Sequence, residues 1–322
     1  MTNLLQKPRI SLKYINIIIF FSFLLFFILA SPNHVFLDPR NLQALIRLIP
    51  EFAIVTLGIG LLLISGEIDL SISSIIPMCA YIFTLLIMTG VSAFFIVITV
   101  LCVGLVIGLL NGLITTKGRI PSFITTLGTM MLLKGILYPL SGMTTIGIGK
   151  YLAKEPFLVK VFVGEVFGVP AQFLWFILFA LILGLLLHFH KFGSWIYATG
   201  DNKEAARAMG INTDLVKIIC FMIVGFLCAF SSIIQVIRVG AFNVVLGTFY
   251  ELQAIAACVM GGVSLFGGRG GVIGILLGSF LIPIIQNGMV FVGINPAGTT
   301  AFIGMAIIIF ALLNILMERG WR

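Results

Sequence analysis

The sequence has little charge. Asp, Glu, Lys and Arg make up only 9% of its 322 residues, whereas hydrophobic residues make up 60%. A soluble globular domain has about 25% charged residues, so this composition excludes that class and indicates an integral membrane protein. Long apolar runs favour a helical bundle over a β-barrel. The net charge of +8 does not indicate nucleic-acid binding, because Lys and Arg collect on the cytoplasmic side of membrane proteins.

Metal-binding and catalytic patterns are also scarce. The five cysteines all lie in hydrophobic runs and none forms a CxxC pair, so we expect neither a metal site nor a disulfide. His188 and His190 have no third ligand nearby, which favours a position at a span end over metal binding. No GxxxxGK[ST] motif occurs, so this chain does not hydrolyse ATP by that machinery. An intramembrane protease is disfavoured, because neither a mid-span histidine nor paired mid-span aspartates occur.

Hydropathy predicts an all-α polytopic membrane protein with about ten transmembrane helices in one domain, residues 1–322. The spans are expected at 15–31, 43–64, 70–89, 92–115, 120–141, 171–190, 214–237, 250–266, 271–291 and 298–317. Most Lys and Arg residues fall at one set of span ends, which places both termini in the cytoplasm. The expected connections are a cytoplasmic tail at 1–14, an outer loop at about 142–170 and a cytoplasmic loop at about 191–213.

Two short echoes suggest an inverted repeat of two five-helix halves. Residues 108–112 (GLLNG) are followed by Ile-Pro, and residues 284–288 (IIQNG) are followed by Asn-Pro. Residues 66–71 loosely resemble residues 261–266. With five spans per half, the halves would have opposite orientations, as in many transporters. Asn-Gly pairs also arise by chance, so repeat and coincidence both stay open.

The first candidate segment is 65–74 (SGEIDLSISS), which lies at an inner span junction. Carboxylates are costly in lipid, so Glu67 and Asp69 imply an interface, a water-filled cavity or a helix cap. Capping of the third helix by Asp69 is favoured over ion coupling, because a new apolar run follows it. The candidate residues here are Gly66, Glu67, Asp69 and Ser71.

The second candidate segment is 266–271 (FGGRGG), with four glycines around one arginine. Such a segment predicts a tight hairpin between two spans. A phosphate-binding loop is the alternative, and it is disfavoured because the required spacing is absent. The candidate residues are Gly267, Gly268, Arg269 and Gly270.

The third candidate segment is 199–211 (TGDNKEAARAMGI), a polar island on the longest inner loop. Alanines favour a short helix and two glycines bracket it. An ordinary solvated loop is the alternative, but mixed charge beside small residues favours a helix that docks another protein. The candidate residues are Gly200, Asp201, Asn202, Glu204, Ala205, Ala206, Arg207 and Gly210.

Four polar residues lie within predicted spans and are candidates for a transport path or for packing: Glu51, Asn111, Lys134 and Asn287. Glu51 and Lys134 are each expected to face protein or water, because an isolated charge in lipid is costly.

Four segments in the expected order resemble the ribose/xylose-type permease family, the membrane subunits of bacterial ATP-binding-cassette sugar importers. They are GEIDLSISS (66–74), IPSFITTLGTMMLLKGI (120–136), ATGDNKEAARAMGI (198–211) and ELQAIAACVMGGVSLFGGRGGVIG (251–274). The resemblance covers about residues 43–317. Glu67 and Ser73 stand where many relatives have glycine, and Lys134 stands where arginine is expected.

The resemblance implies a type II importer-like fold in the bacterial inner membrane. Two permease subunits, alike or related, would form the path, and two separate subunits would bind ATP and Mg²⁺. An extracytoplasmic binding protein would deliver the sugar, and membrane lipid would surround the complex. Residues 199–211 would be the coupling loop that contacts the ATPase. No cofactor is expected on this chain, and the resemblance does not identify the sugar. The alternative function is an ion-coupled carrier or channel for a small polar solute, with Glu51 as its mid-span carboxylate.

Overall fold

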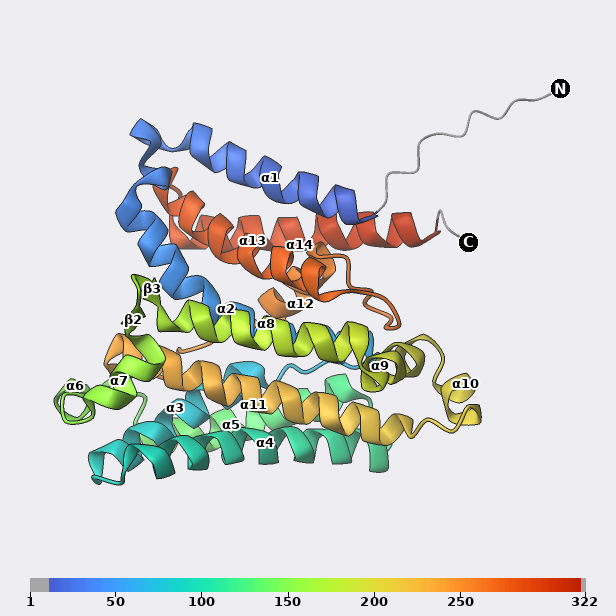
Figure 1. The fold of residues 1–322 in the computed structure, drawn as a ribbon, viewed down its shortest axis with the longest axis horizontal. Helices are drawn as coiled ribbons and strands as arrows, with labels where there is room; N and C mark the ends of the chain where they lie inside the picture. Colours follow the sequence, from blue (N-terminus) through green and yellow to red (C-terminus); the bar gives the residue numbers. More distant parts are fainter. Residues whose placement is uncertain (1–11, 320–322) are drawn as a thin grey trace.

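The structure, a computed structural model, describes residues 12–319 and is an elongated bundle of helices (Figure 1). Residues 1–11 and 320–322 lie outside the described residues, so most of the predicted tail at 1–14 falls there. The first described helix, α1, begins at Leu12. The start of α1 therefore lies within the cytoplasmic tail that was predicted at 1–14.

Ten helices occupy the positions of the ten predicted spans. They are α1 (Leu12–Ala30), α2 (Pro39–Ile64), α3 (Ile72–Met88), α4 (Ala93–Lys117), α5 (Ser122–Ser141), α8 (Ala171–Phe189), α11 (Thr213–Val239), α12 (Tyr250–Met260), α13 (Val272–Phe291) and α14 (Pro296–Arg319). Among the described residues, six of these are long and apolar enough to cross a membrane: α2, α4, α5, α8, α11 and α13. The chain is a polytopic all-α membrane protein, as predicted.

The predicted span at 250–266 is wrong in length. Helix α12 has only 11 residues, which corresponds to about 16 Å at 1.5 Å per residue. A bilayer core is about 30 Å thick, so α12 alone does not cross it. The helix stops because Gly261 and Gly262 follow it, and Gly262 has a φ of +84°. A non-helical segment then leads to α13.

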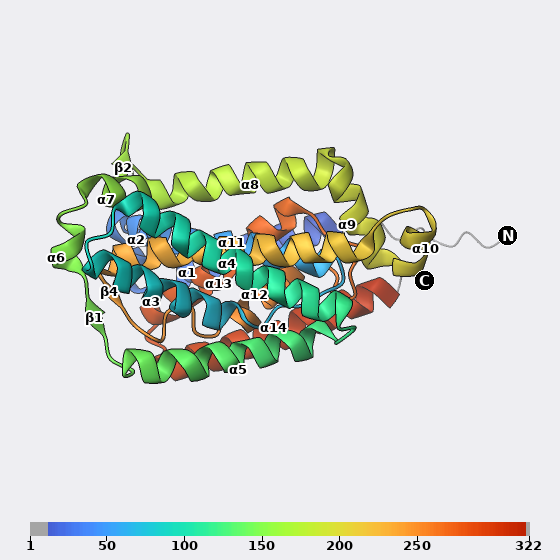
Figure 2. The ribbon, with the colours of Figure 1, turned by 90° about the horizontal axis from the view of Figure 1, so that it is seen from below.

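The shorter elements lie at the two ends of the bundle (Figures 1 and 2). We call one end the α10 end, because it holds α9 (Lys191–Asp201) and α10 (Lys203–Ala208). The opposite α7 end holds α6 (Gly149–Leu152) and α7 (Pro156–Val163). Helix α1 begins and α14 ends at the α10 end (Figure 1).

Two small antiparallel pairs fold the predicted outer loop over the α7 end. Strand β1 (Ile146–Gly147) pairs with β4 (Ala241–Phe242), with Ile146 opposite Phe242. Strand β2 (Glu165–Val166) pairs with β3 (Val169–Pro170), with Glu165 opposite Pro170. The 3-10 helix η1 (Pro32–Leu37) connects α1 to α2 at the same end. The loop is thus attached to the end of α11 by β-pairing.

Helices α2 and α11 form the centre of the bundle. Most residues of both are buried, whereas α4, α5 and α8 leave most of their surface exposed. Exposed apolar side chains are the expected surface of a helix that faces lipid. The core is therefore organised around two long helices, and the others surround them (Figure 2).

Glycines bring α4 and α11 into backbone contact. Gly104, Gly108 and Gly112 lie four residues apart along α4; Gly225 of α11 faces the first two and Ile218 faces Gly112. A Cβ on Gly108 would lie 2.3 Å from the carbonyl oxygen of Phe221, and one on Gly225 would lie 2.1 Å from that of Gly104. Small residues at this spacing let helices pack closely where no hydrophobic effect drives them together.

The helix packing follows the pattern that an inverted repeat of five helices predicts. Helices α3, α4 and α5 pack on one another, as do α12, α13 and α14. Helix α11 contacts α3 and α4, and α2 contacts α12 and α13. Asn111 lies near the α10 end of α4, whereas Asn287 lies near the α7 end of α13. The two Asn-Gly segments, 108–112 and 284–288, therefore have the opposed orientations that an inverted repeat predicts.

The second echo does not belong to this repeat. Residues 66–71 and 261–266 both lie at the α10 end, where Gly66 and Gly267, the residue after the second segment, face Gly200 of α9. Both segments end a helix in the same way, with a glycine at φ of +84°, Gly66 in the first and Gly262 in the second. Glu67 N donates to Leu62 O, and Val263 N donates to Cys258 O, both at a separation of five residues. This is the ordinary helix-ending hydrogen bond with a left-handed glycine.

We expect Gly108→Val to destabilise the fold by about 1–3 kcal/mol, because its side chain meets backbone and overpacks the contact between α4 and α11. Thermal unfolding of the purified chain in detergent measures this effect.

Gly128→Val on α5 is the matched control, because a Cβ there meets nothing within 4 Å. Equal melting temperatures for the two variants would show that the close contact contributes nothing to stability.

Candidate functional site

Helix α10 is a short exposed helix with a defined turn at each of its ends. Asn202 Oδ1 accepts a hydrogen bond from Ala205 N at 3.0 Å, which caps the first turn. After the last turn Gly210 adopts a φ of +83°, and its N–H donates to Arg207 O. Ala206 is fully buried, and the exposed face includes Glu204, Ala205, Ala208 and Met209. The predicted helix at 199–211 is thus present, and its alanines divide between two faces.

Gly200 does not start this helix, in contrast to the prediction. It lies in the last turn of α9, a separate helix that precedes α10. A Cβ on Gly200 would lie 1.9 Å from Ile64 O and 2.6 Å from Gly268 N. The position therefore requires glycine because the backbone of α9 touches the end of α2 directly.

The three candidate segments meet at this point. We call Gly66, Gly200, Gly267 and Gly268 the glycine junction. Gly268 N donates to Ile64 O at 2.8 Å, and a Cβ on Gly267 would lie 2.9 Å from the Cα of Gly66. Gly66, Gly267 and Gly268 all have positive φ values, which glycine adopts at little cost. The junction joins the turn after α2, the turn before α13 and the end of α9 by backbone contact.

The predicted hairpin at 266–271 is therefore used in packing. Its Gly268 N–H is committed to Ile64, and its Arg269 carbonyl accepts from Ser264 N at 3.0 Å. Tyr197 of α9 donates its hydroxyl to Gly270 O at 2.8 Å. Burial raises the pKa of Tyr197, so the phenol keeps the proton that this hydrogen bond needs. Arg269 itself is exposed.

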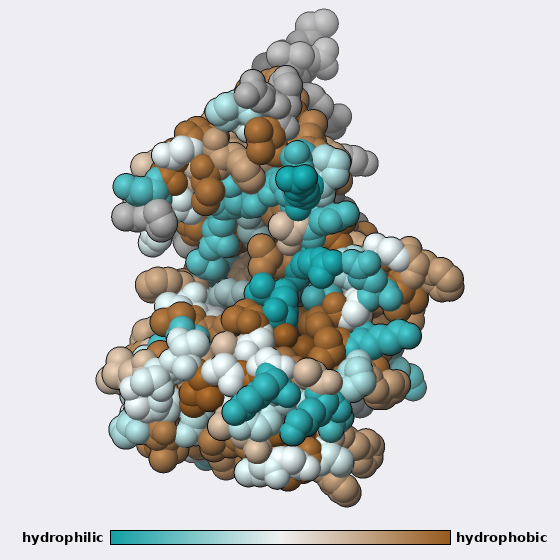
Figure 3. Space-filling view, turned by 90° about the vertical axis from the view of Figure 1, so that its left-hand side faces the viewer, coloured by the Kyte–Doolittle hydropathy of each residue, from teal (hydrophilic) through white to brown (hydrophobic). Residues whose placement is uncertain are grey.

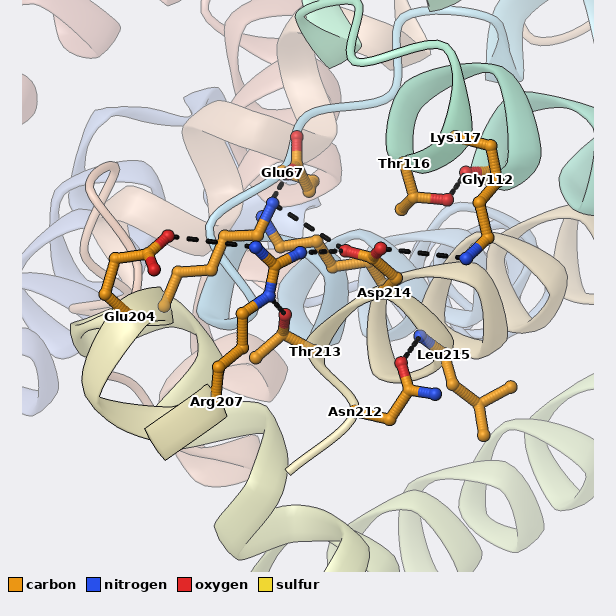
Figure 4. Close-up of polar contacts among 12 residues, drawn as sticks. Glu67, Gly112, Thr116, Lys117, Glu204, Arg207, Asn212, Thr213, Asp214 and Leu215 are labelled. Atoms are coloured by element: carbon orange, nitrogen blue, oxygen red, sulfur yellow. Dashed lines mark hydrogen bonds and ion pairs between the residues drawn. The ribbon is translucent and has the colours of Figure 1, made fainter. Parts of the chain in front are cut away.

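Asp214, at the start of α11, connects α10 to the bundle (Figure 4). Arg207 Nη2 lies 2.7 Å from Asp214 Oδ1, and Arg207 Nε donates to Thr213 Oγ1 at 2.9 Å. Lys203 and Lys117 approach the same carboxylate at 3.7 and 3.8 Å. Isolated surface pairs contribute about 0–1 kcal/mol each. A shared carboxylate instead fixes the position of α10 against α4 and α11.

Arg207 is thus occupied within the chain, whereas Glu204 is not fixed in the same way. The Glu204 side chain is 83% exposed and lies 3.8 Å from Arg207 Nη1 at its nearest oxygen. Asp201 is also exposed, and its backbone packs beside Gly268. The side chains that α10 presents outward are therefore one carboxylate, small alanines and Met209.

Glu67 forms a second ion pair at the α10 end, with Lys217 of α11. Both side chains are largely buried, so Lys217 offsets part of the cost that a lone carboxylate would have there. Beside them lies a cleft of about 560 Å³, lined in part by Arg119, Lys203 and Asp214.

Asp69 caps the turn in front of α3, and the predicted cap of the helix itself is wrong. Its Oδ1 accepts from Ser71 N at 2.7 Å and from the Ser71 hydroxyl at 2.5 Å. Asn111 Nδ2 donates to Ser71 Oγ, and Asn111 Oδ1 accepts from Thr129 Oγ1. The helix starts one residue after Ser71, so Asp69 is too early in the chain to reach its free N–H groups. The buried network instead joins α3, α4 and α5.

The other candidates lie apart from this site. Glu51 pairs with Arg238 at the end of α11, and Asn287 Nδ2 donates to Asn41 Oδ1 at 2.9 Å. Lys134 is half-buried on α5, where the described residues offer it no ion pair. Asn111 belongs to the network around Asp69. The four span candidates therefore do not form one path within this chain.

Sequence reasoning missed several residues that hold the site together. They are Tyr197, Thr213, Asp214 and Lys217. The Asn-Thr-Asp start of α11 is a helix-capping pattern, and it could have marked Asp214 as a residue at a helix entrance. Nothing in the sequence indicates which of the nearby cations it binds.

The chain matches the family model described as "Branched-chain amino acid transport system / permease component" over residues 41–312. It is 34% identical to the xylose/arabinose import permease protein XylH of Sulfolobus acidocaldarius, over 99% of this chain and 88% of that protein. It is 33% identical to the ribose import permease protein RbsC of Bacillus subtilis, over 91% and 90%. It is 34% identical to the autoinducer 2 import system permease protein LsrC of Escherichia coli, over 84% and 78%.

No solved structure matches the chain. The family match covers most of the chain, including α10 and the glycine junction. The alignments with the three relatives cover 84% to 99% of this chain. The chain therefore belongs to this transport permease family, as a member of the ribose/xylose-type carbohydrate permeases that its four motifs resemble.

Proposed function

We propose that the chain is the membrane-spanning permease of an ATP-binding-cassette importer for a pentose or a related monosaccharide. Relatives named for xylose, arabinose and ribose support the substrate class. ATP and Mg²⁺ are bound by two separate partner subunits, and α10 is the helix that contacts one of them.

The observation on which this proposal rests is the geometry of α10. It lies beyond the ends of the spans (Figure 2) and has exposed Glu204, Ala205 and Met209. Small side chains let a partner approach the backbone closely, and one carboxylate beside them can fix the register of docking. The other face of α10 is fixed to α11 through Arg207 and Asp214. A force on α10 is therefore transmitted to a central helix of the bundle.

The glycine junction supplies a second connection. Helix α9 touches the end of α2 with no side chain between them, and Gly268 links the same point to the segment before α13. Close-packed protein interiors have low compressibility and transmit strain. Movement of α9 is thus passed to α2 and α13 together, as alternating access requires.

The orientation of the chain in the membrane follows from the assignment of α10 as the helix that contacts an ATP-binding subunit. The α10 end is cytoplasmic, so both termini are cytoplasmic, and the α7 end faces outward to a sugar-binding protein. The membrane is the bacterial inner membrane. A second permease chain, identical or related, packs against this one to complete the path. Exposed α5 supports that arrangement, since Gly128 and Gly135 face open space and Lys134 needs water or a partner.

An ion-coupled carrier is the weaker candidate. It requires an intramembrane carboxylate that gains and loses an ion during the cycle. Glu51 is buried and paired with Arg238, which donates to both of its oxygens. Such a pair resists the release of either charge, which favours a structural role for Glu51.

We expect the double variant Glu204→Lys with Ala205→Arg to lose copurification with the ATP-binding partner subunit. The substitutions reverse one exposed charge and place a large cation where a small residue stood. Sugar uptake in cells that express the complete transporter is expected to fall with the loss of the complex.

Lys154→Glu at the α7 end is the control, because it also reverses one exposed charge. If the double variant binds the ATPase and transports as the control does, α10 is not the docking helix.

We expect Gly200→Ala to keep the ATPase bound but to lower transport on the order of tenfold, a loss of about 1.4 kcal/mol. The added methyl group forces α9 away from Ile64 and leaves α10 unchanged. Transport per unit of bound ATPase, measured in proteoliposomes, separates this outcome from a docking defect.

Gly149→Ala on α6 serves as its control, because a Cβ there meets nothing within 4 Å. Unchanged transport by the Gly200 variant would mean that the glycine junction does not transmit movement.

A further inference from the structure

A polar cleft opens among α2, α11, α12 and α13 near the α7 end. Its volume is about 320 Å³, close to the lower limit of about 300 Å³ for small-molecule pockets. Arg238, Tyr250 and Asn287 place it near the helix ends on this side. The view onto the α7 end shows hydrophilic surface gathered in a hollow across the middle of the molecule (Figure 3).

The charge of the cleft is balanced. Glu51 and Arg238 both line it and pair with each other, with Arg238 Nη2 donating to Glu51 Oε2 at 3.0 Å. Glu51 is 2% exposed, so its charge is directed at Arg238 and not at the open space. The lining includes no further charged residue. A charged solute therefore gains little here from Coulomb attraction, and a neutral solute fits better.

The cleft has spare hydrogen-bonding capacity. Four amides line it: Gln235, Gln253, Gln286 and Asn287. In the part of the chain that the structure describes, Asn287 Oδ1 is buried without a hydrogen-bond partner. Gln253 and Gln286 are half-buried residues of the lining. Each amide presents both a donor and an acceptor, which matches the paired donor and acceptor of neighbouring hydroxyl groups.

The remaining lining is apolar or aromatic. The rings of Phe52 and Tyr250 lie edge to face with centroids 5.0 Å apart, and both border the cleft. Leu45 and Leu48 add apolar surface from the outer turns of α2. Such a surface suits contact with the C–H faces of a sugar ring, while the amides can form hydrogen bonds with the hydroxyl groups at the edge of the ring.

We infer that this cleft binds one neutral, polyhydroxylated solute of monosaccharide size within a single permease chain. It is the first position that the sugar takes on leaving the binding protein. The inference rests on the proposed function for the sidedness and the substrate class, but the binding itself is measured without transport.

Protection from a thiol reagent tests the binding. Gln286→Cys is introduced in a Cys102→Ser background, because Cys102 is the exposed cysteine and the other four are buried. The probes are D-ribose, D-xylose and L-arabinose at 100 mM, and the reagent is a membrane-impermeant methanethiosulfonate. We expect at least one pentose to slow labelling on the order of threefold. Arg40→Cys, exposed at the same end, is expected to react at a constant rate.

Equal labelling with and without all three pentoses overturns the inference. Equal slowing at both positions also overturns it, because the effect is then not specific to the cleft. Neither result depends on the ATPase or on the binding protein.

Transport gives a second measurement. Leu48→Trp fills the mouth of the cleft, and Leu42→Trp is matched to it on the same helix, with 41% and 39% exposure respectively. In cells with the complete transporter, Leu48→Trp is expected to lower pentose uptake on the order of tenfold and Leu42→Trp to leave it unchanged.

The two ideas fail in different ways. If the unmodified transporter imports a pentose and Leu48→Trp imports it equally well, the cleft is not on the route and the proposed function stands. If the unmodified transporter imports none of the three pentoses, the proposed function fails, and the labelling result alone decides the cleft.

Discussion

The structure depends on close approach of backbone to backbone where side chains are absent. At the glycine junction, Gly200 leaves no space between α9 and the last carbonyl of α2. Along the bundle, Gly104, Gly108 and Gly225 do the same between α4 and α11. In a membrane, apolar surfaces gain little from leaving lipid, so helices associate through such close contacts and through buried hydrogen bonds. The glycines are therefore the positions that determine which helices touch.

Much of the architecture follows from hydropathy alone. Ten apolar runs predict ten helices, and a helix is present at each position, but one of them is much shorter than its predicted span. The α12 helix is the exception, because residues 261–266 are apolar enough to extend a span but contain the glycines that end one. Hydropathy averages over a window and does not register a left-handed turn. The paired glycines after Met260 were the available indication of a break.

The site was less predictable than the fold. Motif resemblance singled out Gly66, Gly200 and Gly267, and the structure brings all three together. The role of each was not predictable, because it depends on contacts between segments more than 60 residues apart. Arg207 illustrates this limit, since the same side chain suits a partner protein or a neighbouring carboxylate, and only the position of Asp214 decides between them.

Helices α2 and α11 have a further property that concerns motion. Glu51 pairs with Arg238 near the α7 end, and Glu67 pairs with Lys217 near the α10 end. In both pairs the carboxylate belongs to α2 or the turn after it, and the cation belongs to α11. Separating the charges of a buried pair leaves each of them uncompensated, which is costly, so both pairs together oppose sliding of one helix past the other. The two helices are thus held as one rigid body, so a displacement of either helix moves the other with it.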